Sequence, residues 1–378
     1  MRLPIVAANA IRTRKLIAPG QRVLVALSGG PDSAALLHCL MELASKRDLR
    51  FSIAAAHLNH GLRGKRAAED EEFCRKLCAR RRIPLVRAFV DTPRLAATLK
   101  RSREETARIA RHAFLAIAAA QTGADCVAVG HHADDRVETV IYRLCRGTGL
   151  AGLQGIGWTG PLRLDGEPDV RASLEWRSGG VKSPACRKDA GRAAGRAART
   201  GAPVVRPLLA CTRKEVLAYL QSKRQKFCTD ESNFDVHIPR NAVRNLVLPL
   251  LEEKVHPGAR AALWRLAEEA EMHAEKRALR RDWLAAFARI GEHGQLALPV
   301  PRLGAAPASD EIGDVLELLR SIWNLGDAGF SHRHVDALRH LFNPASGAKR
   351  LVLPGGLTAQ RRHRAVVLRR ELRGLGEQ

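Results

Sequence analysis

Short apolar runs alternate with longer amphipathic stretches over about residues 20 to 160. The apolar runs have strand length and lie at 23–27, 53–57, 85–90 and 126–130. Helix-like stretches with apolar residues three and four apart lie between them, around 33–45, 66–82, 102–122 and 134–145. Strands that alternate with helices favour a parallel sheet covered by helices on both faces. The pattern therefore predicts an α/β fold, with ligands gathered beyond the carboxyl ends of the strands.

The remainder of the chain has a mainly helical pattern. A helix is expected at 212–220, and long helical patterns follow from 241 to 287. A Pro/Gly-rich break near 291–309 precedes two expected helices (311–324 and 332–342) and a hairpin that turns at Pro354-Gly355-Gly356. We expect three parts: an α/β domain at 1–220, a helical linker or second domain at 221–290, and a small α+β subdomain at 291–378.

Residues 161–203 differ from both regions. From 177 to 199 the chain carries seven basic residues and one acid, separated by Gly, Ala, Ser and Pro. This composition buries too little apolar surface to order itself, so we interpret 161–203 as a flexible basic insertion. A solvated loop and a loop that closes on RNA phosphates fit the composition equally well.

The net charge of +24 and a pI near 10.7 favour a polyanionic partner such as nucleic acid. Of the eight cysteines none forms a Cys-x-x-Cys pair, so neither a disulfide framework nor a zinc knuckle is expected. No apolar stretch approaches membrane-spanning length, and the first fourteen residues lack the apolar core of a signal peptide. These features predict a cytoplasmic protein.

The most informative motif is Ser28-Gly29-Gly30-Pro31-Asp32-Ser33, directly after the first apolar run. Its glycines let the backbone approach an anion, and its hydroxyls, amides and following helix N-terminus supply donors. It lacks the Lys-Ser/Thr pair of a Walker A loop. Asp32 at a polyanion site is costly unless a metal ion or a chemical role compensates for its charge.

A second cluster, Gly130-His131-His132-Ala133-Asp134-Asp135-Arg136-Val137-Glu138, follows the fourth run and opens a helix. Asp135 and Glu138 are three apart, so both carboxylates project from one face of the first turn. Two acids at this position also complement a helix N-terminus with no further role. The neighbouring histidines favour a site that holds Mg²⁺ and moves protons.

Three further segments carry polar groups near strand ends or on helices. They are His57-Leu58-Asn59-His60-Gly61-Leu62-Arg63, Glu104-Glu105-Thr106-Ala107-Arg108-Ile109-Ala110-Arg111, and the glycine-rich stretch 146–156. On the second segment, Glu104, Arg108 and Arg111 share a helical face, which a surface salt-bridge ladder would also explain.

These motifs occur in the order of one family. Together with Arg206-Pro207-Leu208-Leu209 and Arg240-Asn241-Ala242-Val243-Arg244, they resemble the bacterial tRNA(Ile)-lysidine synthetases, which are PP-loop, N-type ATP pyrophosphatases. The resemblance implies a Rossmann-like ATP pyrophosphatase domain followed by a smaller, mainly helical domain. It also implies that ATP adenylates the C2 oxygen of the wobble cytidine in the CAU anticodon of tRNA(Ile), with release of pyrophosphate. Free lysine then displaces AMP to give lysidine.

The resemblance carries specific residues with it. The implied nucleotide-binding residues are Ser28, Gly29, Gly30, Pro31, Asp32, Ser33 and His57. The implied catalytic residues are Asp32, Asp135, Glu138, His132, Arg111 and Arg206. Asp32 and Asp135 would suit Mg²⁺, and Asp135 and Glu138 would bind and deprotonate the lysine ammonium. The implied ligands are ATP, Mg²⁺, L-lysine and tRNA(Ile), the last held in part by 291–378; whether the chain forms a homodimer stays open.

Some positions depart from the family pattern. Arg136 stands where the family usually has glutamine, the insertion is long, and the extra C-terminal domain of longer members is not expected after residue 378. The alternatives are a tRNA-thiolating enzyme of the same superfamily and a non-catalytic RNA-binding protein. Thiolation of the 2-thiocytidine type calls for Cys-x-x-Cys pairs, and a non-catalytic protein has no need of the costly carboxylates at 32, 135 and 138.

Overall fold

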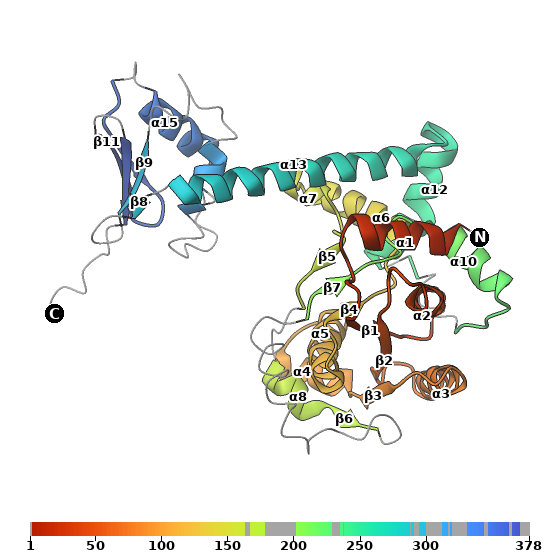
Figure 1. Cartoon of the computed structure of the whole chain (residues 1–378). Helices are drawn as coiled ribbons and strands as arrows, with labels where there is room; N and C mark the ends of the chain where they lie inside the picture. Colours follow the sequence, from red (N-terminus) through yellow and green to blue (C-terminus); the bar gives the residue numbers. More distant parts are fainter. Residues whose placement is uncertain are drawn as a thin grey trace. The chain divides into compact units, whose positions relative to one another are not determined.

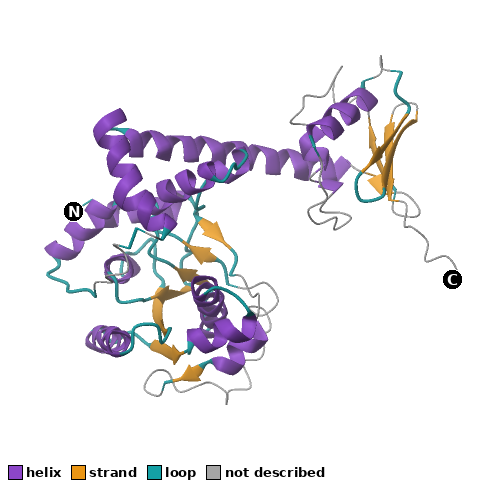
Figure 2. Cartoon of the chain, turned by 180° about the vertical axis from the view of Figure 1, so that it is seen from behind, coloured by secondary structure: helices purple, strands orange, loops and turns teal. Residues whose placement is uncertain are grey.

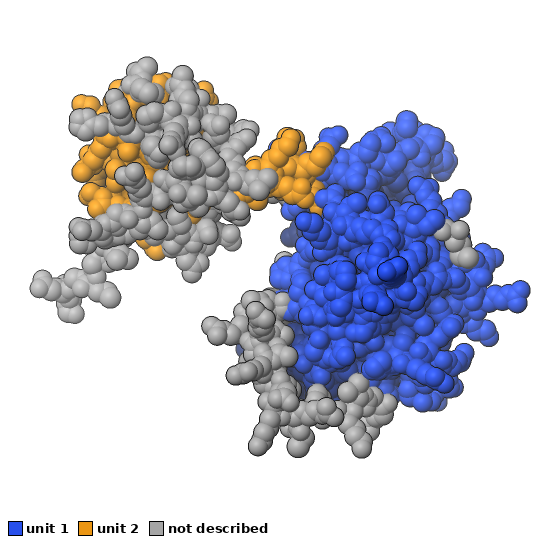
Figure 3. Space-filling model, in the orientation of Figure 1, with its two compact units in different colours: residues 1–270 blue, residues 271–378 orange. Residues whose placement is uncertain are grey.

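The computed structural model divides the chain into two compact units, residues 1–270 and 271–378 (Figure 3). It describes residues 2–162, 167–177, 202–228, 235–236, 238–287, 289–290, 295–299, 312–316, 318–319, 331–343, 347–362 and 365–370. Each unit has its own sheet and its own apolar core.

The first unit is built on a seven-stranded sheet in the order β5-β7-β4-β1-β2-β3-β6. The parallel strands are β1 (Arg22–Ala26), β2 (Ser52–Asn59), β3 (Leu85–Phe89), β4 (Cys126–Ala128) and β7 (Val204–Val205). The edge strands β5 (Thr159–Gly160) and β6 (Glu175–Trp176) run antiparallel. The predicted α/β fold and its first four strands are confirmed.

Helices cover both faces of this sheet (Figures 1 and 2). One core lies under α1 (Leu3–Thr13), α2 (Pro31–Ala44), α3 (Lys65–Arg80) and α10 (Arg213–Ser222). The other lies under α4 (Thr92–Leu99), α5 (Arg103–Thr122) and α8 (Glu167–Ser173). Successive residues of β1 alternate between these cores: Val23 and Val25 belong to the first and Leu24 to the second.

Part of the predicted insertion is folded. Val170 of α8 and Leu174 are buried in the core under α5, and β6 pairs with β3. Apolar side chains at 170 and 174 are enough to anchor this segment, although the surrounding composition is polar. The most basic part of the insertion, 178–201, lies outside the described residues.

The helical region after α10 begins with short elements. They are α11 (Pro239–Ala242), the π-helical turn η2 (Val243–Val247), α12 (Leu248–Leu250), a second π-helical turn η3 (Leu251–Val255) and α13 (Ala259–Phe287). Val243 and Leu248 pack against Val137 and Ile141 of α6 (Ala133–Cys145). Residues up to 270 therefore belong to the first unit, whereas we expected them in a helical second domain.

The second unit contains an antiparallel sheet in the order β10-β11-β12-β9-β8. Its strands are β10 (Arg350–Leu353), β11 (Leu357–Arg362), β12 (Ala365–Arg370), β9 (Leu296–Pro299) and β8 (Arg289–Ile290). Helix α15 (His332–Phe342) packs on this sheet, and Leu341, Phe342, Leu357 and Leu368 are fully buried. The predicted hairpin is present, but its second strand is two strands, and β9 lies within the expected Pro/Gly-rich break. Within the described parts of the chain, no helix is long and apolar enough to cross a bilayer.

Candidate active site

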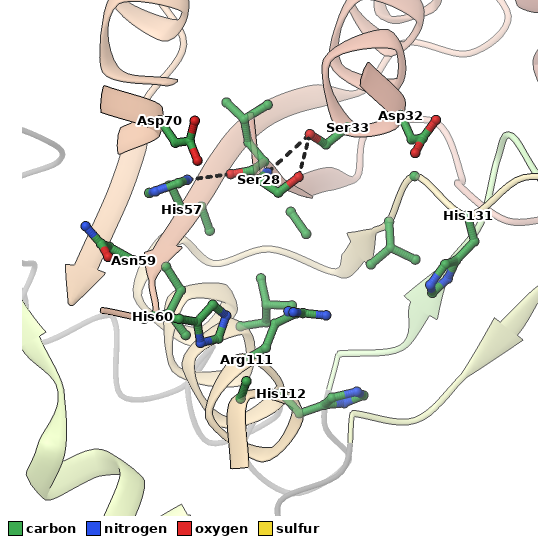
Figure 4. Close-up of a pocket in the computed structure, with 18 of the residues that line it drawn as sticks. Ser28, Asp32, Ser33, His57, Asn59, His60, Asp70, Arg111, His112 and His131 are labelled. Atoms are coloured by element: carbon green, nitrogen blue, oxygen red, sulfur yellow. Dashed lines mark hydrogen bonds between the residues drawn. The ribbon is translucent and has the colours of Figure 1, made fainter. Parts of the chain in front are cut away.

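The turn after β1 is organised by its own serines. The backbone N–H of Ser28 donates to Ser33 Oγ at 3.2 Å, and the two hydroxyl oxygens lie 3.1 Å apart (Figure 4). Ser33 Oγ also donates to the carbonyl of Gly30 at 3.0 Å. Gly29 has φ +93°, a conformation that side chains disfavour. The turn thus delivers the chain to the N-terminus of α2, where backbone amides are available to an anion.

Two glycines allow this turn to be packed closely. A Cβ on Gly29 would lie 3.3 Å from the sulfur atoms of Cys74 and Cys228. A Cβ on Gly130, which follows β4, would lie 2.8 Å from the backbone carbonyl of Asp32. Gly130 therefore brings the second motif directly against the start of α2.

A cavity of about 470 Å³ opens beside the turn, at the carboxyl ends of β1, β2 and β4. It is lined by residues from five of the sequence motifs (Figure 4). Those that the sequence singled out are Ser28, Asp32, Ser33, His57, Arg111, His131 and Arg206. The structure thus brings most of the predicted site together at the edge of the sheet that the fold predicts. His132, Asp135 and Glu138 do not line this cavity; they lie next to it, in the first turn of α6.

His132 connects the two motifs. It is the N-cap of α6: its Nδ1 accepts from the backbone N–H of Asp135 at 3.4 Å, and Asp135 Oδ2 accepts from the backbone N–H of His132 at 2.9 Å. Its Nε2 lies 3.6 Å from Asp32 Oδ1. Burial raises the pKa of Asp32, against the opposing charges of His132 and Arg213, whose Nη1 lies 3.5 Å from Asp32 Oδ2.

Two arginines, Arg240 and Arg244, form ion pairs with Asp135 and Glu138. Glu138 is fully buried; its Oε1 accepts from Arg244 Nε at 2.6 Å, and its Oε2 accepts from Arg240 Nε and Arg244 Nη2 at 3.0 Å. Asp135 Oδ1 accepts from Arg240 Nη2 at 2.8 Å and Arg244 Nη2 at 3.2 Å. Arg240 and Arg244 were singled out only by the family resemblance, and their contacts with Asp135 and Glu138 were not predicted. Their spacing of four on a helix was the available signal that both reach one target.

Three of the histidines that line the cavity, His57, His60 and His131, are neutral near pH 7. Burial lowers the pKa of His57, whose Nδ1 donates to the carbonyl of Leu27 at 2.8 Å. It lowers the pKa of His131 to about 4, and that of His60, beside Arg111, to about 3. Because it is neutral, His131 can accept at Nδ1 from Arg206 Nε, at 3.1 Å.

Arg111 and Arg206 both contribute positive charge to the cavity. Arg206 Nη1 donates to the carbonyl of Gly157 at 2.9 Å, so its guanidinium is fixed from two sides. Burial and the nearby Arg108 lower the pKa of Arg111, whose side chain extends from α5 into the cavity (Figure 4). The structure thus places Arg111 in the candidate site, whereas a surface salt-bridge ladder was the structural alternative for this helix.

Arg136, the departure from the family pattern, is fully buried. Its Nε donates to the carbonyl of Gln154 and its Nη2 to the carbonyl of Ala267, both at 3.0 Å, and its guanidinium lies 4.8 Å from the ring centroid of Trp264. The arginine therefore ties the first turn of α6 to the glycine-rich segment and to α13.

A cation would find one suitable oxygen at this site. Asp32 Oδ1 is buried and accepts no hydrogen bond from the described residues, so a hard cation would fit it. Both oxygens of Asp135 already accept hydrogen bonds from Arg240, Arg244 and the N–H of His132. Among the described residues, no group of three or more His, Cys, Asp or Glu side chains converges as a ready-made metal site.

Comparison with known proteins agrees with this geometry. The PP-loop domain family matches residues 6–251. A tRNA(Ile)-lysidine synthase of Chlorobaculum tepidum is 36% identical over 258 residues, which are 68% of this chain and 65% of the relative. That of Geobacter sulfurreducens is 34% identical over 361 residues (94% and 66%), and that of Porphyromonas gingivalis 38% over 264 residues (70% and 48%). The matches thus span between about half and two thirds of these relatives' lengths. Because the PP-loop domain model matches residues 6–251, which are more than half of the chain, the chain belongs to the PP-loop family.

Proposed function

We propose that this protein is a tRNA(Ile)-lysidine synthase, a ligase that forms a carbon–nitrogen bond. The C2 oxygen of the wobble cytidine in the CAU anticodon of tRNA(Ile) attacks the α-phosphorus of ATP and pyrophosphate leaves. The ε-amine of lysine then attacks C2, and AMP leaves with that oxygen. The observation that carries the proposal is the cavity at the carboxyl ends of β1, β2 and β4, where the serine-glycine turn, Asp32, Arg111 and Arg206 meet. The similarity to lysidine synthases supports the choice of substrate.

The turn is assigned to the β- and γ-phosphates of ATP. Ser28, Ser33 and the amides of Gly29 and Gly30 offer hydroxyl and N–H donors around one concave backbone, at the N-terminus of α2. Pro31 holds the first turn of that helix in place. Neutral His57, on the same side of the cavity, is available for hydrogen bonds to the nucleoside.

Mg²⁺ is assigned to Asp32 rather than to Asp135. A bound Mg²⁺ would neutralise charge on the phosphates and draw electrons from the α-phosphorus. Burial makes the charged form of Asp32 costly and so raises its pKa. The positive charge of the ion would offset that cost. The guanidiniums of Arg111 and Arg206 are then placed to stabilise charge that develops on the α-phosphate and on the cytidine oxygen.

Asp135 and Glu138 are assigned to the second substrate. The ammonium of lysine must lose a proton before it can attack C2, and a neighbouring carboxylate is the simplest acceptor. His132 lies between these carboxylates and Asp32, so it links the lysine side of the site to the phosphate side.

A thiolating enzyme is the alternative with the same fold. It would need accessible, reactive thiols, because the thiolate is the nucleophile and the metal ligand. Burial instead raises the pKa of the thiols nearest the site, to about 12 for Cys228 and still higher for Cys74. These thiols are therefore protonated at pH 7, which favours the ligase.

The test offers the full chain ATP, Mg²⁺, radiolabelled lysine and a tRNA(Ile) transcript with a CAU anticodon. We expect label in the RNA, dependent on ATP, and none with the Asp32→Ala variant. Asp48→Ala is the matched control, because Asp48 pairs with Arg12 on the surface and should leave incorporation intact. Labelled RNA from a transcript whose wobble cytidine is replaced by uridine, or no labelled RNA at all, would rule out the proposal.

A further inference from the structure

The carboxylates assigned to lysine are not accessible in this structure. Glu138 has no exposed surface, and its two oxygens together accept three hydrogen bonds from Arg240 and Arg244. Asp135 Oδ1 accepts from the same two side chains. An ammonium group cannot reach either carboxylate on this side unless a guanidinium moves.

The two arginines are held differently. Arg244 binds both oxygens of Glu138, its side chain is 20% exposed, and the charge of Asp32 stabilises it further. Arg240 gives one hydrogen bond to each carboxylate, and its side chain is 43% exposed. Arg240 also sits on the four-residue helix α11. Arg240 is therefore the guanidinium that can leave, and Arg244 the one that stays.

We propose that Arg240 is an exchangeable counter-ion that keeps the lysine site shut until a phosphate group draws it away. The inference rests on the proposed function, because it takes the Asp135–Glu138 pair as the lysine site. The exchange replaces one cation by another, so no buried carboxylate is left without a partner at any stage. The released guanidinium finds its new partner in a phosphate, with which arginine forms a strong forked pair.

Two substrates could supply that phosphate, namely the nucleotide in the adjacent cavity and the backbone of the tRNA. In either case lysine binding is coupled to prior binding of the phosphate-bearing substrate. The coupling is reciprocal, so bound lysine also tightens binding of that substrate. Arg240 thus sets the order in which the substrates bind: the phosphate-bearing substrate binds first and lysine second. Free lysine therefore does not occupy the site before the cytidine can be activated.

Equilibrium dialysis of radiolabelled lysine against the full chain tests this exchange. Lysine is offered alone, with Mg²⁺ and α,β-methylene-ATP, or with an unmodified tRNA(Ile) transcript. For the wild type we expect the affinity for lysine to rise at least about tenfold in one of the last two arms, and that arm identifies the source of the phosphate. The Arg240→Gln variant should bind lysine alone about tenfold more tightly than the wild type, with little further gain in either arm.

Arg260→Gln is the matched control. Arg260 also bridges two carboxylates, with Nη1 2.8 Å from Asp134 Oδ1 and Nε 2.9 Å from Glu252 Oε2, but it contacts neither Asp135 nor Glu138. This variant should bind lysine like the wild type. Nε-acetyl-lysine, which lacks the ammonium, should gain nothing from Arg240→Gln. Arg240→Lys, which keeps the charge and loses the fork, provides a second variant if Arg240→Gln does not fold.

Equal lysine affinity for the wild type and both Arg240 variants in all three arms would overturn the exchange. If the wild type still transfers lysine to tRNA, only the role of Arg240 is then lost, and the carboxylates serve to position the arginines. If no lysine is transferred to tRNA, the proposed function itself is wrong. The two failures are therefore distinguished by the transfer assay.

Discussion

Asp32 Oδ1 and His132 Nε2 lie 3.6 Å apart, and neither atom has a hydrogen-bond partner among the described residues. Both atoms are buried, and an unpaired buried polar atom carries a free-energy cost. The two residues come from different motifs, separated by a hundred positions along the chain, and Gly130 allows their backbones to approach. A small displacement of Asp32 would create a hydrogen bond between the two side chains. The same two atoms are also available to bind a ligand.

The Asp32→Asn variant should be more stable and inactive. Because burial raises the pKa of Asp32, the folded protein holds this proton more tightly than the unfolded chain, and stability falls as the pH rises through that window above 3.8. Replacing the carboxylate by the neutral amide removes this cost, and we expect a gain of about 0.5–2 kcal/mol at pH 7. Urea denaturation measures the gain, and lysine transfer to tRNA should fall by about 10³-fold or more. A variant that is both less stable and active would contradict the assignment of Asp32.

His132 has a structural role and a proposed chemical role, and two substitutions separate them. His132→Asn keeps an acceptor for the N–H of Asp135, so the helix cap should survive, whereas His132→Ala should lose about 1 kcal/mol of stability. Both variants lose the Nε2 that faces Asp32 and should lose about 10²-fold in turnover. Thermal melts and initial rates measured side by side distinguish the roles. Full activity in a stable Asn variant would leave His132 as a cap alone.

Gly130 should not tolerate a methyl group. A Cβ at this position meets the backbone of Asp32 at 2.8 Å, and backbone atoms cannot give way as a flexible side chain can. We expect Gly130→Ala to cost about 1–3 kcal/mol and to raise the KM for ATP more than it lowers kcat. Gly347→Ala is the control, since a Cβ there meets nothing within 4 Å. An unchanged KM in the Gly130 variant would show that the two turns need not touch.

Stability should fall as the medium becomes acidic, through the buried neutral histidines. The pKa of His60 is lowered to about 3 and that of His131 to about 4, so the unfolded chain gains these protons first as the pH falls below 6.5. Each histidine should remove about 1.4 kcal/mol per pH unit between about 6.5 and 4. His60→Asn should reduce that slope, whereas at pH 8 both proteins hold neutral side chains at this position. Urea denaturation at intervals of half a pH unit measures the free energy of unfolding against pH. A slope unaffected by the substitution would argue against a buried neutral His60.

The second unit offers a candidate surface for RNA. Arg350, Arg362 and Arg369 are exposed, and the strand register places them on one face of the sheet, opposite the buried Leu357 and Leu368. Replacing all three by glutamine should weaken tRNA binding and reduce the salt dependence, log Kd against log salt, by about 2. A control that neutralises the ion-paired surface arginines Arg12, Arg75 and Arg101 has the same net charge change. Equal losses in both triple variants would mean that total charge, rather than this face, holds the RNA.

The fold of the first unit could be predicted because its pattern is local. Residues 23–25 of β1 and 126–128 of β4 are buried on both faces of the sheet and therefore form unbroken apolar runs in the sequence. Helix α1 was not expected, because its alanines fit many structures, and only packing on α2 and α10 makes it a helix. The two-residue strands β5, β6 and β7 are too short for any periodicity and exist only through their partners.

The sequence singled out several residues that the structure brings together at the cavity, but it did not show which side chains contact one another. The turn after β1 depends on glycines and serines at fixed spacing, which the sequence displays directly. The pairing of Asp135 and Glu138 with Arg240 and Arg244 spans about a hundred residues, so no local pattern reports it. The burial of Arg136 could not be predicted for the same reason. The carbonyls of Gln154 and Ala267, which accept its hydrogen bonds, lie far from it in the sequence.

The π-helical turn η2 lets two sets of residues with different spacings face α6 at the same time. Val243 and Leu248 are five apart, and both are buried against α6, whereas Arg240 and Arg244 are four apart and both reach the carboxylates. An α-helix advances by about 100° per residue, so it cannot satisfy both spacings in one segment, and the wider turn absorbs the extra residue. A one-codon deletion at Asn245 would therefore leave the composition almost untouched, yet rotate the apolar anchor away from the arginines that it serves.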